Sequence, residues 1–202
     1  MKIFIVSGPS GVGKSHLINE LSQKGLYPLE VYTDRKRRPF EGEITDRVYL
    51  THKEFTDSLA DFLYWFEFQG NRYGYKTSDI ETNRKKSKSV VFNIPLTFLQ
   101  DVLDKLPEAV VIHLDVDTDN FNMLYARMVA RDLSGDETED DKNQKLSKIK
   151  KRLDFAKKEI EEISDLGFIT KHDPLSKVFV VKDNSTLYDE VIPYILDVLW
   201  MD

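Results

Sequence analysis

Residues 2–15 read Lys-Ile-Phe-Ile-Val-Ser-Gly-Pro-Ser-Gly-Val-Gly-Lys-Ser, and this stretch decides the fold. The β-branched and aromatic run at 2–7 predicts a buried central strand. Apolar residues at helical spacing over 15–24, followed by Gly25, predict a helix that ends there. A strand, a glycine-rich turn and a helix, in this order, form the setting in which a phosphate-binding loop occurs.

The glycine-rich turn at 8–15 fits the pattern G-x-x-x-x-G-K-[ST]. Glycines let successive backbone N–H groups point into one concavity, and the following helix adds the positive end of its dipole. Lys14 is expected to reach the outer phosphates of a nucleoside triphosphate, and Ser15 to give its hydroxyl to Mg²⁺. The predicted ATP-binding residues of this segment are Gly8, Ser10, Gly11, Gly13, Lys14, Ser15 and His16. The alternative is a turn that only joins the strand to the helix, and the Lys-Ser ending argues against it.

Further strands and helices are expected from runs of β-branched residues and from apolar residues at helical spacing. The strands are expected at 89–94, 109–116 and 177–181, and the helices at 97–106, 121–131, 146–166 and 187–199. Strands that alternate with helices predict an α/β fold, a three-layer sandwich with a central parallel sheet.

The region 31–80 departs from this pattern because it is polar, rich in turns and built from short extended pieces. Its expected elements are extended segments at 30–33 and 47–50, a short helix at 53–59, and a hairpin of 63–68 with 71–75 around Gln69 and Gly70. The region is therefore predicted to be a small β-rich insertion. The acidic stretch 133–146 is expected to be mobile.

Composition excludes several classes of protein. The chain has 202 residues, 41% of them hydrophobic, which is enough for a packed core. It has no cysteine, so disulfides and thiolate metal sites are excluded. The apolar run that starts at Ile3 is too short for a signal sequence or a membrane span, and we expect a soluble cytoplasmic protein. The net charge of −6 argues against general binding to nucleic acid.

Three polar features could indicate other sites, and each is expected to be structural. The charged runs 84–88 and 136–141 are expected to be solvated surface. His113 lies within a predicted strand, with no second histidine at ligand spacing, and is expected to be a core residue. The chain also lacks the Asn-Lys-x-Asp motif of switch GTPases and is too short for a motor protein, which leaves a small phosphotransferase.

The chain resembles guanylate kinases over most of its length. The resemblance rests on the loop at 7–15, on the segment 33–49, which is similar to the family pattern Thr-Thr-Arg-x-x-Arg-x-Gly-Glu…Tyr, and on the turn Gly-Asn-Arg-Tyr-Gly at 70–74. The family segment is two residues shorter than 33–49, so Glu41 and Glu43 compete for one role.

The resemblance implies a role for each matched residue. Acceptor phosphate binding is implied for Arg35, Arg38, Tyr49 and Tyr73, and arginine forks and phenol hydroxyls suit phosphate oxygens. Lid arginines that neutralise the transferred phosphoryl group are implied at Arg127, Arg131 and Arg152, and Asn184 is implied near the adenine. The remaining acceptor-binding candidates are Tyr32, Glu43, Tyr64, Tyr75 and Asn93. The implied domains are a core of 1–30, 81–125 and 167–202, an acceptor region of 31–80 and a lid of 126–166.

The chain departs from the family where guanine is read. Guanylate kinases have a Ser in place of Tyr32, a Glu in place of Tyr64, a Ser or Thr near Tyr75, and Asp-Ile-Asp where this chain has Asn-Ile-Pro at 93–95. A lost carboxylate leaves the N1–H and 2-amino donors of guanine unpaired, which predicts weaker binding of GMP. The run Val-Val-Phe-Asn at 90–93 is similar to ribose 1,5-bisphosphate kinases, which phosphorylate a sugar phosphate.

These observations predict an ATP- and Mg²⁺-dependent phosphotransferase that acts on a small phosphorylated acceptor. A nucleoside monophosphate is expected, GMP or dGMP by the resemblance. The alternatives are a ribose-phosphate kinase, an inactive module that binds phosphopeptides, and a slow ATPase switch. An inactive module has no need of Lys14, which ranks it below the enzyme. The sequence leaves open whether the chain forms a homodimer.

Overall fold

The computed structural model describes residues 1–37, 47–133, 137–162 and 166–201. Arg38 and Glu43, both expected to bind the acceptor, lie outside this part of the chain, as does Glu41.

A five-stranded sheet forms the middle of the molecule, and all of its strands run parallel. In sheet order the strands are β2 (Tyr27–Pro28), β7 (Val90–Asn93), β1 (Ile3–Ser7), β8 (Val110–Asp115) and β9 (Lys177–Val180). Every residue of β1 is buried, as a central strand covered on both faces must be. The predicted central parallel sheet is confirmed.

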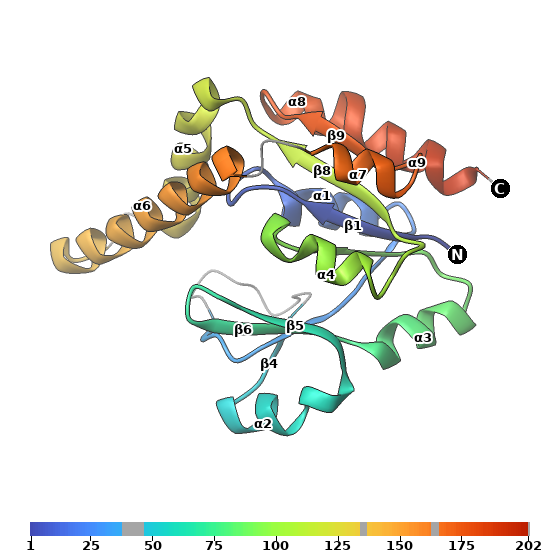
Figure 1. Cartoon of the computed structure of the whole chain (residues 1–202). Coiled ribbons are helices and arrows are strands. Elements are labelled where there is room, and N and C mark those ends of the chain that lie inside the picture. The colour runs from blue at the N-terminus through green and yellow to red at the C-terminus, as the bar shows by residue number, and fades with distance from the viewer. Residues whose placement is uncertain (38–46, 134–136, 163–165, 202) are drawn as a thin grey trace.

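Helices cover both faces of this sheet, which confirms the three-layer sandwich (Figure 1). One face packs against α1 (Lys14–Ser22), α5 (Phe121–Asp132), α6 (Glu139–Glu162) and α9 (Ile192–Trp200), the last preceded by the short turns α8 (Asn184–Thr186) and η4 (Leu187–Val191). The other face packs against α3 (Thr77–Lys85), α4 (Leu99–Leu103), which follows the 3₁₀ turn η2 (Leu96–Phe98), and α7 (Gly167–His172). A further 3₁₀ turn, η3 (Thr118–Asn120), precedes α5.

A second, four-stranded sheet lies beyond α4 and corresponds to the predicted β-rich insertion (Figure 1). Its order is β4 (Arg47–Tyr49), β3 (Val31–Thr33), β6 (Asn71–Lys76) and β5 (Phe62–Phe68), with β3 and β4 parallel and the other pairs antiparallel. The predicted hairpin is formed by β5 and β6. It turns at Gln69 and Gly70, which both have positive φ. The helix α2 (His52–Asp57) and the turn η1 (Leu59–Asp61) connect β4 to β5.

The helix expected at 146–166 begins earlier than predicted, at Glu139, and so includes the second half of the stretch 133–146. The hydroxyl of Thr138 accepts a hydrogen bond from the backbone N–H of Asp141 at 3.3 Å. Acidic residues in a first helical turn interact favourably with the helix dipole. The acidic run is therefore the beginning of the long helix. The helix α3 was not predicted because its sequence is mostly charged and polar, and Ile80 is the large apolar residue that it buries.

His113 is a buried residue of β8, 1% exposed, and it pairs in register with Ser7 of β1. Within the described ranges, neither the Ser7 hydroxyl oxygen nor His113 Nδ1 has a hydrogen-bond partner. Burial, and to a smaller extent the charge of Lys14, lower the pKa of His113 to about 3. The imidazole is therefore neutral in the folded protein at ordinary pH.

Across the described ranges, no helix is both long and apolar enough to span a membrane.

We predict that His113 makes the protein sensitive to acid. Below the ordinary pKa of 6.5 the unfolded chain binds a proton that the folded chain excludes, so stability is lost as pH falls from 6.5 toward about 3. The loss approaches about 1.4 kcal/mol per pH unit. Between about pH 7 and pH 4.5, the free energy of unfolding of the unaltered protein should fall by roughly 2 kcal/mol more than that of the His113→Leu variant. Urea unfolding at both pH values measures this difference. Equal losses in both proteins would contradict the assignment.

Candidate active site

The glycine-rich loop between β1 and α1 wraps tightly against the end of β8. Gly8 has φ +135°, and a Cβ at this position would lie 2.2 Å from the carbonyl oxygen of Leu114. Gly13 has φ +119° and forms the N-cap of α1. The loop can follow this path only with glycine at Gly8, because any side chain there would displace the backbone. The start of α1 therefore lies directly after a loop that is packed against the end of β8.

Lys14 is folded back over the loop. Its Nζ donates to the carbonyl oxygens of Gly8 at 2.6 Å and Pro9 at 2.9 Å. Burial lowers the pKa of Lys14 to about 8, the charge of Glu159 acts in the opposite direction, and Arg152 and Arg131 lower it further. The lysine therefore lies in a desolvated site with two arginines and one carboxylate around it, and the three cationic side chains suit a polyanionic ligand.

Two predicted lid arginines contact the loop directly. Arg152 of α6 donates to the Ser10 hydroxyl at 2.6 Å and to Asp132 Oδ2 at 2.7 Å. Arg127 of α5 donates to the carbonyl oxygen of Val12 at 2.9 Å. Two helices far from the loop in sequence thus bring guanidinium groups to it.

The other predicted ATP-side residues lie around this cluster. Arg127 also donates to the Asn184 side-chain oxygen at 2.6 Å, so Asn184 is adjacent to the lid arginines. Arg131 pairs with Asp132, with Nε 2.7 Å from Oδ1. His16 is exposed, and its Nε2 lies 2.8 Å from the Tyr188 hydroxyl. Ser15, at the start of α1, is exposed.

A hollow opens beside the loop and separates the central sheet from the second sheet. It encloses about 150 Å³, less than the ~300 Å³ at which small-molecule sites usually begin, so an acceptor must widen it. Four parts of the chain line it: the loop, the inner face of the second sheet, the end of β7 and α6. The lining residues are Gly8, Ser10, Lys14, Val31, Arg47, Phe66, Phe68, Tyr73, Tyr75, Asn93, Pro95, Phe155 and Glu159.

The structure brings some of the expected acceptor residues to this hollow. Tyr73, Tyr75 and Asn93 line it, and the Tyr75 hydroxyl donates to the carbonyl oxygen of Asn93 at 2.7 Å. Arg35 and Tyr49 lie next to each other at the end of the second sheet, where Arg35 Nη2 donates to the Tyr49 hydroxyl at 3.3 Å.

Four expected acceptor residues do not line the hollow: Arg35 and Tyr49, which pair at the end of the second sheet, and Tyr32 and Tyr64. Tyr32 alternates with Val31 along β3 and faces the outer side of the sheet, where its ring lies 5.8 Å from that of Phe62. Tyr64 donates its hydroxyl to Asp101 of α4 at 2.7 Å. In this conformation Tyr32 and Tyr64 therefore bond or pack away from the hollow.

Arg47 and Glu159 line the hollow but were not predicted from the sequence as site residues. Glu159 is 7% exposed and accepts hydrogen bonds from the backbone N–H of Thr97 at 3.3 Å and its hydroxyl at 3.2 Å. Burial raises the pKa of Glu159, and the charge of Lys14 opposes this rise. A signal for Glu159 was present, since it lies between Ala156 and Ile160 on the apolar side of the long helix.

The residues around the loop offer few ligands for a metal ion. Among the residues described, no three His, Cys, Asp or Glu side chains are close enough together to hold a metal ion. The exposed Ser15 hydroxyl is a hard oxygen donor, and Mg²⁺ commonly takes few protein ligands and keeps several waters. The residues present therefore fit a Mg²⁺ ion that arrives with a nucleotide.

Comparisons with known proteins agree on one family. A family model described as Guanylate kinase matches residues 1–179. A guanylate kinase of Bacillus cereus is 31% identical over 179 residues, which cover 85% of this chain and 80% of that protein. The guanylate kinase of Mycoplasma capricolum is 30% identical over 94% of this chain and 61% of its own length. A crystal structure of guanylate kinase from Anaplasma phagocytophilum matches 100% of this chain and 87% of its own, with a TM-score of 0.65 and 20% identity, which shows a shared fold.

We predict that Gly8→Ala damages both stability and ATP binding, because the added methyl group meets the Leu114 carbonyl. Gly25→Ala is the matched control: Gly25 also has positive φ (+98°), and a Cβ there meets nothing within 4 Å. The control should lose about 1 kcal/mol in urea unfolding and bind ATP normally. Gly8→Ala should lose roughly 3 kcal/mol or more and bind ATP at least tenfold more weakly by calorimetry. Similar behaviour of the two variants would contradict the role of the close approach.

Proposed function

Because the chain belongs to the guanylate kinase family, we propose that it transfers the γ-phosphoryl group of ATP to the phosphate of GMP. The observation that carries the proposal is the hollow beside the loop, which Lys14 lines from the ATP side and Tyr73 from the acceptor side. A phosphate oxygen of GMP forms a bond to the γ-phosphorus while the bond from this phosphorus to the β-bridging oxygen breaks. The products are GDP and ADP.

Catalysis in this proposal is positioning combined with charge neutralisation. Lys14 leaves the loop carbonyls and binds the outer phosphates of ATP. Arg127, Arg131 and Arg152 neutralise the charge on the transferred group. Two of these arginines already donate to groups of the loop, so they need only exchange these partners for phosphate oxygens.

The adenine side and the metal follow from the same loop. The backbone N–H groups at Gly8, Gly11 and Gly13 surround the phosphates, together with the Ser10 hydroxyl. Asn184 and His16 lie on the side where the adenine would enter. Ser15 would hold Mg²⁺, which would supply positive charge to offset that of the phosphates.

The acceptor side uses the second sheet. Arg35, Arg38, Tyr49 and Tyr73 are proposed to hold the acceptor's phosphate, and Glu43 is proposed as a further acceptor-binding residue. Base contacts are proposed for Tyr75 and Asn93, which line the hollow. Tyr32 and Tyr64 reach the base only if they leave the contacts described above. The regions 31–80 and 126–166 are proposed to close over the two substrates and exclude water.

A sugar phosphate is the second candidate acceptor, and one observation favours it. The hollow is lined by Asn93, where guanylate kinases carry the first Asp of Asp-Ile-Asp, and by the aromatic residues Phe66, Tyr73 and Tyr75. Among the described residues, Glu159 is the one carboxylate that lines it, and it comes from α6 on the side of Lys14. A phosphopeptide-binding module without catalysis is less well supported, because it has no need of Lys14 and the arginines around the loop.

We predict that GMP stimulates ADP release from ATP and Mg²⁺ more than dGMP, AMP, CMP, UMP, ribose 5-phosphate or ribose 1,5-bisphosphate. Lys14→Ala should reduce the stimulated rate at least a hundredfold, because it removes the positive charge that neutralises the transferred group. A coupled assay for ADP measures both. A higher rate with ribose 1,5-bisphosphate would assign the sugar phosphate instead. ADP release that no acceptor stimulates would contradict the kinase proposal.

A further inference from the structure

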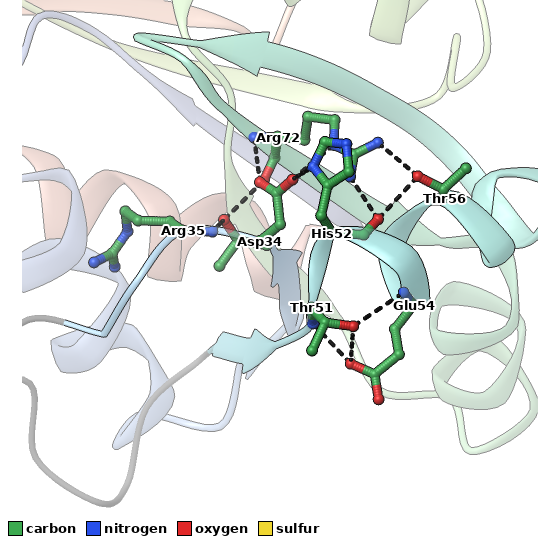
Figure 2. Close-up of polar contacts among 8 residues, drawn as sticks. Asp34, Arg35, Thr51, His52, Glu54, Thr56 and Arg72 are labelled. Atoms are coloured by element: carbon green, nitrogen blue, oxygen red, sulfur yellow. Dashed lines mark hydrogen bonds and ion pairs between the residues drawn. The ribbon is translucent and has the colours of Figure 1, made fainter.

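A buried ion pair lies on the outer face of the second sheet, across the sheet from the hollow (Figure 2). Arg72 Nε donates to Asp34 Oδ2 at 2.7 Å, and the Arg72 backbone N–H donates to Asp34 Oδ1 at 2.8 Å. The two side chains are 13% and 9% exposed. Residues alternate between the faces of a strand, so Arg72 faces outward where Tyr73 faces the hollow.

The Arg72 guanidinium is held on several sides (Figure 2). Nη1 donates to the Thr56 hydroxyl at 3.0 Å, and Nη2 donates to the carbonyl oxygen of His52 at 2.8 Å. The group also lies over the ring of the fully buried Phe55, 4.6 Å from its centroid. These contacts fix the plane of the guanidinium and tie β6 to α2.

The same network reaches the proposed acceptor site through the backbone. The Thr33 hydroxyl donates to the carbonyl oxygen of Arg72 at 2.7 Å and accepts from the backbone N–H of Arg35 at 3.2 Å. Asp34 directly precedes Arg35, and Arg72 directly precedes Tyr73. The ion pair therefore joins the two chain segments that carry the proposed phosphate-binding residues.

We propose that Asp34 and Arg72 are positioning residues that set Arg35 and Tyr73 at the spacing the acceptor's phosphate requires. The inference rests on the proposed function and names no new substrate. Neither residue touches the acceptor, because both point to the opposite face of the sheet and Asp34 balances the charge of Arg72. Arginine suits this role better than lysine, since its planar fork binds the carboxylate and α2 at once.

The Asp34 carboxyl is ionised at working pH. Burial acts to raise the pKa of this carboxyl, but the hydrogen bonds and the charge of Arg72 outweigh it, so the pKa lies below the usual value. A buried ion pair is by itself weak evidence for stability, and other roles for it must be tested directly.

The first variant is Asp34→Asn, which keeps the shape and removes the charge. It should raise the KM for the acceptor roughly tenfold and leave the KM for ATP within about twofold, because only the acceptor side is displaced. Arg84→Gln is the control, since Arg84 forms exposed ion pairs with Glu81 and Glu108 on the surface and should change neither constant.

A double-mutant cycle with Arg35→Gln separates positioning from a general loss of stability. If Asp34 acts through Arg35, the tenfold effect of Asp34→Asn should nearly vanish in the Arg35→Gln background. If Asp34→Asn has the same effect in both backgrounds, or raises the KM for ATP equally, the ion pair supports the fold alone and the positioning role is overturned.

Arg72→Lys keeps the charge and loses the fork, and it takes the place of Asp34→Asn in the cycle if that variant does not fold. The unaltered protein is assayed beside each variant, which separates the two claims. If the unaltered protein turns over and the variants have an unchanged KM for the acceptor, only the positioning role is overturned. No turnover by the unaltered protein with any acceptor overturns the proposed function and, with it, this inference.

Discussion

Positive charge gathered around one short loop is the constraint on which the rest of the structure depends. Lys14 is desolvated, and Arg131 and Arg152 are close enough to lower its pKa further. Such a cluster is stable only with counter-charge nearby. Asp132 supplies it to Arg152 and Arg131, and Glu159 supplies it to Lys14.

This need for counter-charge explains why the long helix α6 lies against the core. Arg152 and Glu159 both come from α6: the first donates to Ser10, and the second accepts from Thr97. The helix is thus attached at the loop and at the segment that follows β7. Phosphates of a nucleotide would bring the charge that the loop now obtains from carboxylates and carbonyl oxygens. A bound polyanion would therefore compete for the same groups that now attach α6 to the loop.

The parts of the structure that the sequence predicted are those that local pattern determines. The strand–loop–helix unit at 2–24 follows from apolar runs and glycines, and the hairpin at 63–75 from alternation and a turn. The start of α6 was missed because its acidic residues stabilise a helix end without any apolar spacing. Which predicted site residues line the hollow has a different cause, namely the register of the strands. Tyr32 faces outward, whereas Arg47 lines the hollow, and which face each takes depends on pairing between distant strands.

Transfer of labelled phosphoryl from ATP to the acceptor tests the central claim most directly, namely that the loop and the hollow form one phosphoryl-transfer site. The protein is incubated with ATP labelled in the γ-phosphate, Mg²⁺ and GMP, and the labelled products are separated. If the loop and the hollow form one such site, the label appears in GDP in an amount equal to the ADP formed. Label found only as inorganic phosphate, with ATP consumed, would contradict it, because water rather than the acceptor would then occupy the hollow.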